Sequence, residues 1–286
     1  MRYQLIAIDL DGTLLDGSGS ISRSNCRAIA TAEAQGILVV PCTGRAWREA
    51  KAELSVLPNL TVGVFVTGAA VVDLPGGRIV DLAVIDPDLA GQIVEHLYDL
   101  PDAVLVFCDA TLAGHDYLVT GHGQLTANTQ WWFERCGSTV HYLDRPTAND
   151  LRHALRIGVV APQSRITEVV ETLGRRFANR VCTHCFQAIQ LVETGEVMYV
   201  LEVFAAGVDK WRGLELIARE RAIEPARIAA IGDQVNDLAM IRGAGCGIAM
   251  GNAVEGVKQA ADHVTLDCGA DGVAAAVEQL LAGTLG

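Results

Sequence analysis

The sequence predicts an α/β fold in which a domain built on a parallel sheet is split in two by an inserted α+β domain. Three changes of pattern along the chain support this prediction. The first third alternates apolar strand candidates with amphipathic helix candidates, as βαβ units do. From about Asp86 short strand candidates broken by loops follow one another, and after Gly207 the βαβ pattern returns. We therefore expect one domain at residues 1–84 and 205–286 and an inserted domain at 85–204, consistent with the length of 286 residues.

The first segment supplies three strands and a helix. Leu5–Ile8 is a short apolar run that ends in a turn signal, which is typical of a buried strand. Ser22 is a favourable N-cap for a helix over Arg23–Gln35, and Gly36 stands where such a helix ends. The next two strands are expected at 37–40 and 61–66.

The inserted segment and the last segment are predicted from the same signals. In the insert we expect two helices, Pro87–Leu100 and Pro162–Leu173, the second with Pro at its start and Gly174 just past its end. Strands of the insert are expected at 103–107, 117–120, 140–143, 156–160, 181–184, 189–192 and 197–204. Beyond Gly207 the pattern predicts helix 210–222, strand 228–231, helix 236–242, strand 246–250 and helix 253–261.

Composition and charge exclude several classes of function. Half of the residues are hydrophobic and a fifth are charged, which is ordinary for a globular protein. The formal net charge of −12 argues against nonspecific nucleic-acid binding and against docking on anionic membranes. We expect no signal peptide and no membrane span, a cytoplasmic location, and a monomer or homodimer. The eight cysteines then indicate free thiols.

Polar side chains follow the predicted strands of the parallel sheet at the points where those strands end. Asp9 and Asp11 follow the first strand, Thr43-Gly44-Arg45 the second, Thr67-Gly68-Ala69 the third, and Gly232–Asp237 the strand near 230. The carboxyl ends of parallel strands lie on one edge of a sheet, where ligands bind. Asp9 and Asp11 are two residues apart, so a strand would direct both to one side, where their mutual repulsion needs a cation, a shared proton or a catalytic role.

This set of residue types indicates phosphate chemistry with a hard metal ion. Carboxylate oxygens without a nearby His or Cys favour Mg²⁺. A cation and Lys210, at the start of a predicted helix, would offset the charge of a phosphoryl group. Thr43 offers a hydroxyl donor, and the glycines allow backbone amides to approach an anion.

These segments, in this order, resemble the motifs of the haloacid dehalogenase superfamily of phosphatases, and most closely its Cof-type sugar-phosphatase branch. Asp9-x-Asp11-Gly-Thr-Leu is similar to the first motif, Thr43-Gly44-Arg45 to the second, Lys210 to the third, and Gly-Asp233-x-x-Asn236-Asp237 to the fourth. The segments 249–253 and 271–273 also resemble signatures of that branch. The resemblance implies a Rossmann-like core interrupted by an inserted α+β cap that governs substrate choice.

The resemblance also implies a role for each residue. Asp9 attacks phosphorus and forms an aspartyl-phosphate, and Asp11 protonates the leaving oxygen and then activates water. Mg²⁺ is held by Asp9, the backbone carbonyl of Asp11 and Asp233. The phosphoryl group is bound by Thr43, Gly44, Lys210 and Asn236, while Asp237 supports the pocket or pairs with Lys210. The implied activity is a Mg²⁺-dependent phosphomonoesterase acting on small phosphorylated metabolites, sugar phosphates first.

Two positions depart from the pattern of that branch. Thr67 stands where Asn is common, which leaves one polar contact on the substrate side undetermined. Trp211 follows Lys210 where Gly is usual, and affects at most the packing behind the lysine.

Other interpretations of the same residues remain open at this point. A phosphomutase of the same branch would need a bound phosphorylated acceptor in place of water. A non-catalytic phosphate-binding regulatory protein could use the same acidic pocket, although Asp11 as an acid/base and the inserted domain favour an enzyme. Each motif alone also has an ordinary structural use, such as a turn at Asp-x-Asp-Gly or a solvated lysine at 210. Cys182-Thr-His-Cys185 could bind zinc or take part in redox chemistry, but it lacks a second ligand pair, and half-buried thiols on a strand are the simpler interpretation.

Overall fold

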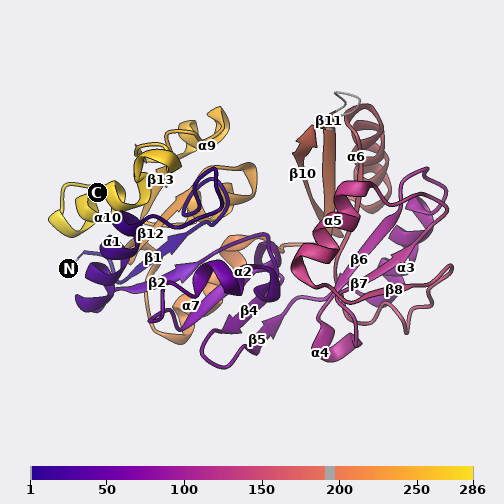
Figure 1. Cartoon of the computed structure of the whole chain (residues 1–286), viewed down its shortest axis with the longest axis horizontal. Coiled ribbons are helices and arrows are strands. Elements are labelled where there is room, and N and C mark those ends of the chain that lie inside the picture. Colours follow the sequence, from indigo (N-terminus) through magenta and orange to yellow (C-terminus); the bar gives the residue numbers. More distant parts are fainter. Residues whose placement is uncertain (1, 191–196, 286) are drawn as a thin grey trace. The chain divides into compact units, whose positions relative to one another are not determined.

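The chain folds into two compact units, as the computed structural model of residues 2–190 and 197–285 shows (Figure 1). One unit comprises Met1–Leu82 and Asp209–Gly286, and the other is the continuous segment Ala83–Val208. The fold class is therefore the predicted one, α/β with an inserted α+β unit. The boundaries between the units lie between residues 82 and 83 and between residues 208 and 209. The boundaries expected from the sequence lay between residues 84 and 85 and between residues 204 and 205.

The first unit is built on a five-stranded sheet with the order β14-β13-β12-β1-β2, in which every neighbouring pair is parallel. Strand β1, which pairs with β12 on one side and β2 on the other, is fully buried and consists of apolar residues, which is typical of a strand covered on both faces. The strands are β1 (Leu5–Ile8), β2 (Leu38–Pro41), β12 (Ile228–Gly232), β13 (Cys246–Ala249) and β14 (His263–Val264).

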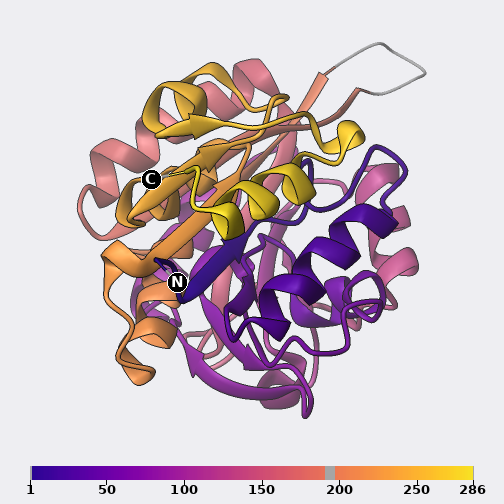
Figure 2. The same cartoon turned by 90° about the vertical axis from the view of Figure 1, so that its left-hand side faces the viewer.

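Helices cover this sheet in packed pairs. Helix α1 (Arg23–Ala34) lies beside α10 (Gly272–Ala282), as the indigo and yellow helices of Figure 2 show. Ser22 caps α1 by accepting a hydrogen bond from the Asn25 backbone N–H, as predicted. Helix α7 (Lys210–Glu220) packs against α8 (Leu238–Gly243), and α9 (Glu255–Ala260) contacts β13. Helix α2 (Trp47–Leu54) follows β2 and was not predicted.

A small antiparallel sheet in the first unit was not predicted. Strand β3 (Val62–Phe65) pairs with β4 (Ala70–Asp73), which pairs with β5 (Arg78–Leu82). Only a single bridge, Cys42 to Val64, joins β3 to β2 in the parallel sense. The sequence did contain the signal for β4 and β5, because Pro75-Gly76-Gly77 separates two apolar runs as a hairpin turn does.

The second unit is a six-stranded sheet, β10-β11-β9-β6-β7-β8, antiparallel except between β7 and β8. Its strands are β6 (Val104–Cys108), β7 (Tyr117–Thr120), β8 (Val140–Tyr142), β9 (Ala154–Pro162), β10 (Val181–Gln190) and β11 (Val197–Ala205). Helices α3 (Pro87–Leu97) and α6 (Gln163–Phe177) contribute to one apolar core with these strands. The short helices α4 (Ala110–Ala113) and α5 (Ala127–Cys136) were not predicted.

Two predictions in the second unit were wrong. Helix α6 continues through Gly174 to Phe177, because Leu173 and Phe177 lie on one face and are both buried in the core. Residues 181–190 form one strand with a register shift between Gln187 and Ile189, where two strands were expected. The expected strand 189–192 otherwise extends outside the described residues.

The unusual Trp211 is accommodated by a glycine on the neighbouring helix. A Cβ at Gly243 would lie 2.4 Å from the Trp211 ring, so the two helices approach closely only because residue 243 has no side chain. Gly243→Ala is expected to lower the free energy of unfolding by about 1–3 kcal/mol through overpacking. Denaturant unfolding measures the loss, and Trp211→Ala in the same chain should recover part of it. Independent, additive effects of the two changes would contradict this packing.

Candidate active site

The predicted site residues come from the carboxyl ends of three adjacent parallel strands. Asp9 follows β1, Thr43 follows β2, and Asp233 follows β12, with β1 between the other two strands. Lys210 is the first residue of α7, whose N-cap is Asp209. All of these residues belong to the first unit, in which the sheet edge positions the first three and the start of α7 positions Lys210.

Three buried carboxylates gather around one buried ammonium. Within the described residues, Asp9, Asp233 and Asp237 make the one group of three or more acidic, His or Cys side chains whose ligand atoms lie within 4.8 Å of one another. Lys210 is fully buried, and its Nζ donates to Asp9 Oδ1 at 2.5 Å and to Asp237 Oδ1 at 2.6 Å. The cluster therefore contains three acidic groups and a single cation.

Asp237 is committed to contacts within the protein. Besides the bond from Lys210, its Oδ2 accepts the backbone N–H groups of Asp233 and Gln234, each at 2.9 Å. Gly232 allows this approach, since a Cβ there would lie 2.6 Å from Asp237. Asp237 thus fixes the Asp233 loop and Lys210 together, which the sequence pattern alone could only suggest.

Asp233 is oriented by two residues of the first motif. Thr13 is fully buried, and its hydroxyl donates to Asp233 Oδ1 at 3.1 Å. Gly12 has a φ of +76°, and a Cβ there would lie 2.5 Å from Asp233 Oδ2. Only glycine combines this backbone conformation with so close an approach. Thr13 lies in the Asp-Gly-Thr run, but the sequence alone does not indicate this contact.

The charge imbalance perturbs the titration of the cluster. Burial, and then the neighbouring Asp237 carboxylate, raise the pKa of Asp9 well above its usual value. The same two causes raise the pKa of Asp233 to about 6. Burial acts to lower the pKa of Lys210, but the carboxylates of Asp237 and Asp9 outweigh it, so the pKa of Lys210 is raised and the amine stays charged.

The donor set fits a hard divalent cation. All the side-chain donors are carboxylate oxygens, the type that Mg²⁺ prefers, and no His or Cys belongs to the cluster. With one ammonium for three carboxylates, the fully ionised cluster has two uncompensated negative charges, which one divalent cation would balance. Since Asp237 already accepts three hydrogen bonds, Asp9 and Asp233 are the better placed ligands.

The raised pKa values predict that the metal-free protein loses stability as the pH rises. The folded state holds the Asp233 proton more tightly than the unfolded chain, whose value is near 3.8, so the stability is present below that pH and is lost as the pH passes about 6. The total loss from Asp233 across this pH range should amount to about 3 kcal/mol, of which about 1 kcal/mol falls between pH 5 and pH 7. Thermal unfolding in EDTA at pH 5 and pH 7 measures this part, and Mg²⁺ should reduce it.

Asp233→Asn is the control for this prediction, because an amide cannot take part in the titration. The variant should show a smaller decline between the two pH values in EDTA. An equal decline in both proteins would show that other groups cause it.

Asp11 lies apart from the three buried carboxylates. Its side chain is 55% exposed, and Arg45 holds it by two hydrogen bonds, one from Nε to Asp11 Oδ2 at 2.9 Å and one from Nη2 to Oδ1. Arg45 also pairs with Glu53 at 3.3 Å. The two aspartates of the first motif therefore differ in environment, which suits them to different tasks. Arg45 belongs to the Thr43-Gly44-Arg45 motif, but the sequence alone does not indicate its contact with Asp11.

Thr43 and Asn236 both lie close to Gly44, Thr43 as its chain neighbour and Asn236 through space. The fully buried Thr43 hydroxyl accepts the Arg45 backbone N–H at 3.1 Å, so its own proton remains available for donation. A Cβ at Gly44 would lie 3.8 Å from Asn236 Nδ2 and 3.4 Å from Thr67 Oγ1. The structure thus brings the predicted Thr43, Gly44 and Asn236 together with Thr67.

The cysteines are all free thiols, and Cys182 and Cys185 are half-buried on β10. Cys182 Sγ lies 3.5 Å from His184 Nε2, and neither cysteine belongs to a metal-binding cluster among the described residues. The interpretation as strand thiols therefore holds for the described part of the chain.

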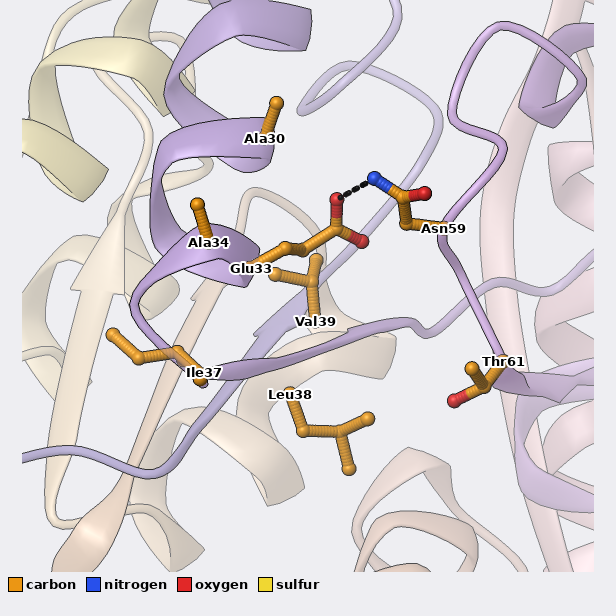
Figure 3. A pocket seen from close by; sticks show the side chains of 9 residues that line it. Ala30, Glu33, Ala34, Ile37, Leu38, Val39, Asn59 and Thr61 are labelled. Atoms are coloured by element: carbon orange, nitrogen blue, oxygen red, sulfur yellow. Dashed lines mark hydrogen bonds between the residues drawn. The ribbon is translucent and has the colours of Figure 1, made fainter.

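A hollow lies elsewhere in the first unit. It has a volume of about 450 Å³ and is lined by the end of α1 and the start of β2, with Asn59 and Thr61 opposite (Figure 3). Its one ionisable lining residue, Glu33, accepts a hydrogen bond from Asn59 at 3.2 Å. Because it lies at the beginning of β2 and Thr43 follows the end of that strand, the hollow is separate from the carboxylate site.

No helix in the described residues is long and apolar enough to cross a membrane.

Comparison with known proteins identifies the family to which this arrangement belongs. A family model described as haloacid dehalogenase-like hydrolase matches residues 6–277. Two similar proteins of Bacillus subtilis (strain 168), YwtE and YcsE, are each named 5-amino-6-(5-phospho-D-ribitylamino)uracil phosphatase. YwtE is 29% identical over 291 residues, covering 97% of this chain and 98% of the relative. YcsE is 31% identical over 278 residues, covering 96% of this chain and 94% of the relative.

A solved structure shares the fold over nearly the whole chain. The sugar phosphatase BT4131 of HAD subclass IIB superposes with a TM-score of 0.73 at 21% identity. The superposition covers 97% of this chain and 98% of that one, so the likeness extends through both units of the fold.

Proposed function

The chain belongs to the family of haloacid dehalogenase-like hydrolases, and from this premise we propose that it is a Mg²⁺-dependent phosphomonoesterase that works through an aspartyl-phosphate on Asp9. Its family and its similarity to proteins named phosphatases make it an enzyme of the phosphatase type. The observation that carries the finer proposal is the placement of Asp9: it is buried, bonded to Lys210, and within 4.8 Å of Asp233.

In the proposed first step, a carboxylate oxygen of Asp9 attacks phosphorus and the bond from phosphorus to the leaving oxygen breaks. Asp11 gives its proton to that oxygen. In the second step water attacks phosphorus, Asp11 takes the proton from the water, and the bond to Asp9 breaks to release phosphate. Two moderate barriers then replace one large one. The exposed position of Asp11 supports this role, since the acid has to reach both a leaving group and water.

The residues around Asp9 supply the positive charge and the donors that the phosphoryl group needs. Lys210, the Thr43 hydroxyl, the Gly44 backbone and the Asn236 amide are proposed to bind its oxygens. Asp9, Asp233 and the backbone carbonyl of Asp11 would hold Mg²⁺, which offsets the repulsion between a carboxylate nucleophile and an anionic substrate. Asp237 keeps Lys210 and the Asp233 loop in place.

We propose small phosphorylated metabolites as substrates, with sugar phosphates first. The names of the relatives support this class, since they specify a phosphorylated ribityl compound and sugar phosphates. The segment Ala83–Val208 is proposed as the cap that selects the leaving group, and the other unit as the catalytic domain. The eight free cysteines support a reducing compartment such as the cytoplasm.

Hydrolysis of a phosphorylated panel tests this proposal. Purified protein with Mg²⁺ should release inorganic phosphate from p-nitrophenyl phosphate and, with higher kcat/KM, from some sugar phosphates. EDTA should abolish the release, and added Mg²⁺ should restore it. Isomerised sugar phosphate without free phosphate would instead indicate a mutase, and activity that EDTA leaves intact would refute the metal requirement.

A further inference from the structure

The turn between β3 and β4 holds two β-branched residues in a strained backbone conformation. Val66 has a φ of 50° and Thr67 a φ of 54°, both in the left-handed region, and Gly68 follows with a φ of 94°. β-Branched residues rarely adopt this conformation, and such outliers concentrate at functional sites.

Contacts on two sides hold this turn in place. On one side, the Val66 N–H donates to the Arg45 carbonyl at 2.9 Å and the Thr67 N–H donates to the Thr43 carbonyl at 3.0 Å. On the other side, Arg212 of α7 donates to the Gly68 carbonyl at 3.1 Å. A Cβ at Gly68 would lie 1.8 Å from the carbonyl oxygen of Asp209, so the turn is pressed against the start of α7. The turn thus lies between the loop that carries Thr43 and the helix that begins with Lys210.

The Thr67 side chain does not take part in holding the turn. Its hydroxyl is buried and has no hydrogen-bond partner, and the same is true of the nearby Asn236 Oδ1. Both side chains border Gly44, because a Cβ there would lie 3.4 Å from Thr67 Oγ1 and 3.8 Å from Asn236 Nδ2. An unpaired buried hydroxyl is costly, so a strained turn that only served structure would be better filled by an apolar side chain. The Asn236 side chain is half-exposed and can move when a ligand binds, whereas the backbone of the turn is held in place.

We propose that Thr67 is a further binding residue of this site, whose hydroxyl donates a hydrogen bond to an oxygen of the phosphoryl group bound beside Gly44. The inference rests on the proposed phosphatase function and extends it to a position where the related branch commonly has Asn. The Thr67 hydroxyl has no hydrogen-bond partner in the ligand-free protein. The proposed hydrogen bond therefore contributes to binding affinity but not to the stability of the ligand-free fold.

Thr67→Val tests the proposal, because it removes the hydroxyl and keeps the shape. The variant should bind inorganic phosphate at least about tenfold more weakly, measured as its inhibition constant in the Mg²⁺ enzyme, since a hydrogen bond to a charged group is lost. Its melting temperature in the absence of phosphate should equal or exceed that of the wild type. Thr67→Ser, which keeps the hydroxyl, should keep the wild-type inhibition constant to within about threefold.

The matched control is Thr120→Val in the other unit. Thr120 is also buried, but its hydroxyl donates to the Asp144 carbonyl at 2.6 Å. That variant should melt at a lower temperature and leave phosphate inhibition unchanged. Unchanged inhibition in Thr67→Val, or a lower melting temperature for it, would overturn the proposal while leaving the phosphatase function intact. A wild-type protein that neither hydrolyses phosphate esters nor binds phosphate would overturn both.

Discussion

Asp9→Asn is expected to lower kcat for phosphate-ester hydrolysis by about three orders of magnitude or more, the usual consequence of removing a catalytic nucleophile. The amide cannot attack phosphorus, and it also removes a ligand from the proposed metal site. The fold should survive, because the change takes one carboxylate out of a cluster that has three for one ammonium, and Lys210 keeps its bond to Asp237. Initial rates with p-nitrophenyl phosphate and with a sugar phosphate measure the effect.

Asp99→Asn is the matched control for this change. The Asp99 side chain is 90% exposed, so the same chemical substitution there should leave both the rate and the melting temperature unchanged. Turnover by Asp9→Asn within tenfold of the wild type, in protein free of contaminating phosphatase, would exclude Asp9 as the nucleophile.

Lys210→Met is expected to impair both stability and catalysis. The ammonium is fully buried between Asp9 and Asp237, and its removal leaves buried carboxylates without a cation. Breaking a buried pair in this way costs about 3–5 kcal/mol of unfolding free energy. Loss of its charge from the phosphoryl site should lower kcat by about a hundredfold or more. Denaturant unfolding in EDTA and kcat with saturating Mg²⁺ separate the two effects.

The exposed Lys51 provides the control for this prediction. Lys51→Met should leave stability and activity unchanged. A Lys210→Met protein as stable as the wild type in EDTA would show that the buried carboxylates are not ionised against this lysine, and would contradict the charge arrangement described above.

Much of the site could be predicted because its residues follow apolar strands. Asp9, Thr43 and Asp233 each stand at the end of a buried parallel strand, and such strand ends share one sheet edge. Lys210 is different: it begins a helix, and nothing in its own neighbourhood distinguishes it from a solvated lysine. Lys210 is buried between Asp9 and Asp237 because folding brings together segments that lie far apart in the sequence. Asp9 and Lys210 are separated by about two hundred residues.

The contacts that local sequence did not reveal are long-range or depend on backbone strain. The bond from Thr13 to Asp233 and the pairing of Arg45 with Asp11 join segments that are distant in sequence. The left-handed conformation of Thr67 has no sequence signature, because β-branched residues ordinarily avoid it. Glycine commonly ends helices, yet α6 continues through Gly174 because Phe177 is buried. At this position tertiary packing outweighs the low helix propensity of glycine.

Nucleophilic attack by Asp9 is tested most directly by finding where the phosphoryl group is held during turnover. The Mg²⁺ enzyme is mixed with excess substrate, quenched in acid within a single turnover, digested, and analysed by mass spectrometry. We expect one additional phosphoryl mass on the peptide that contains Asp9, with fragmentation placing it on that residue, and none in Asp9→Asn. A phosphoryl group on any other side chain, or release of phosphate with no phosphorylated peptide at any time in the turnover, would contradict it.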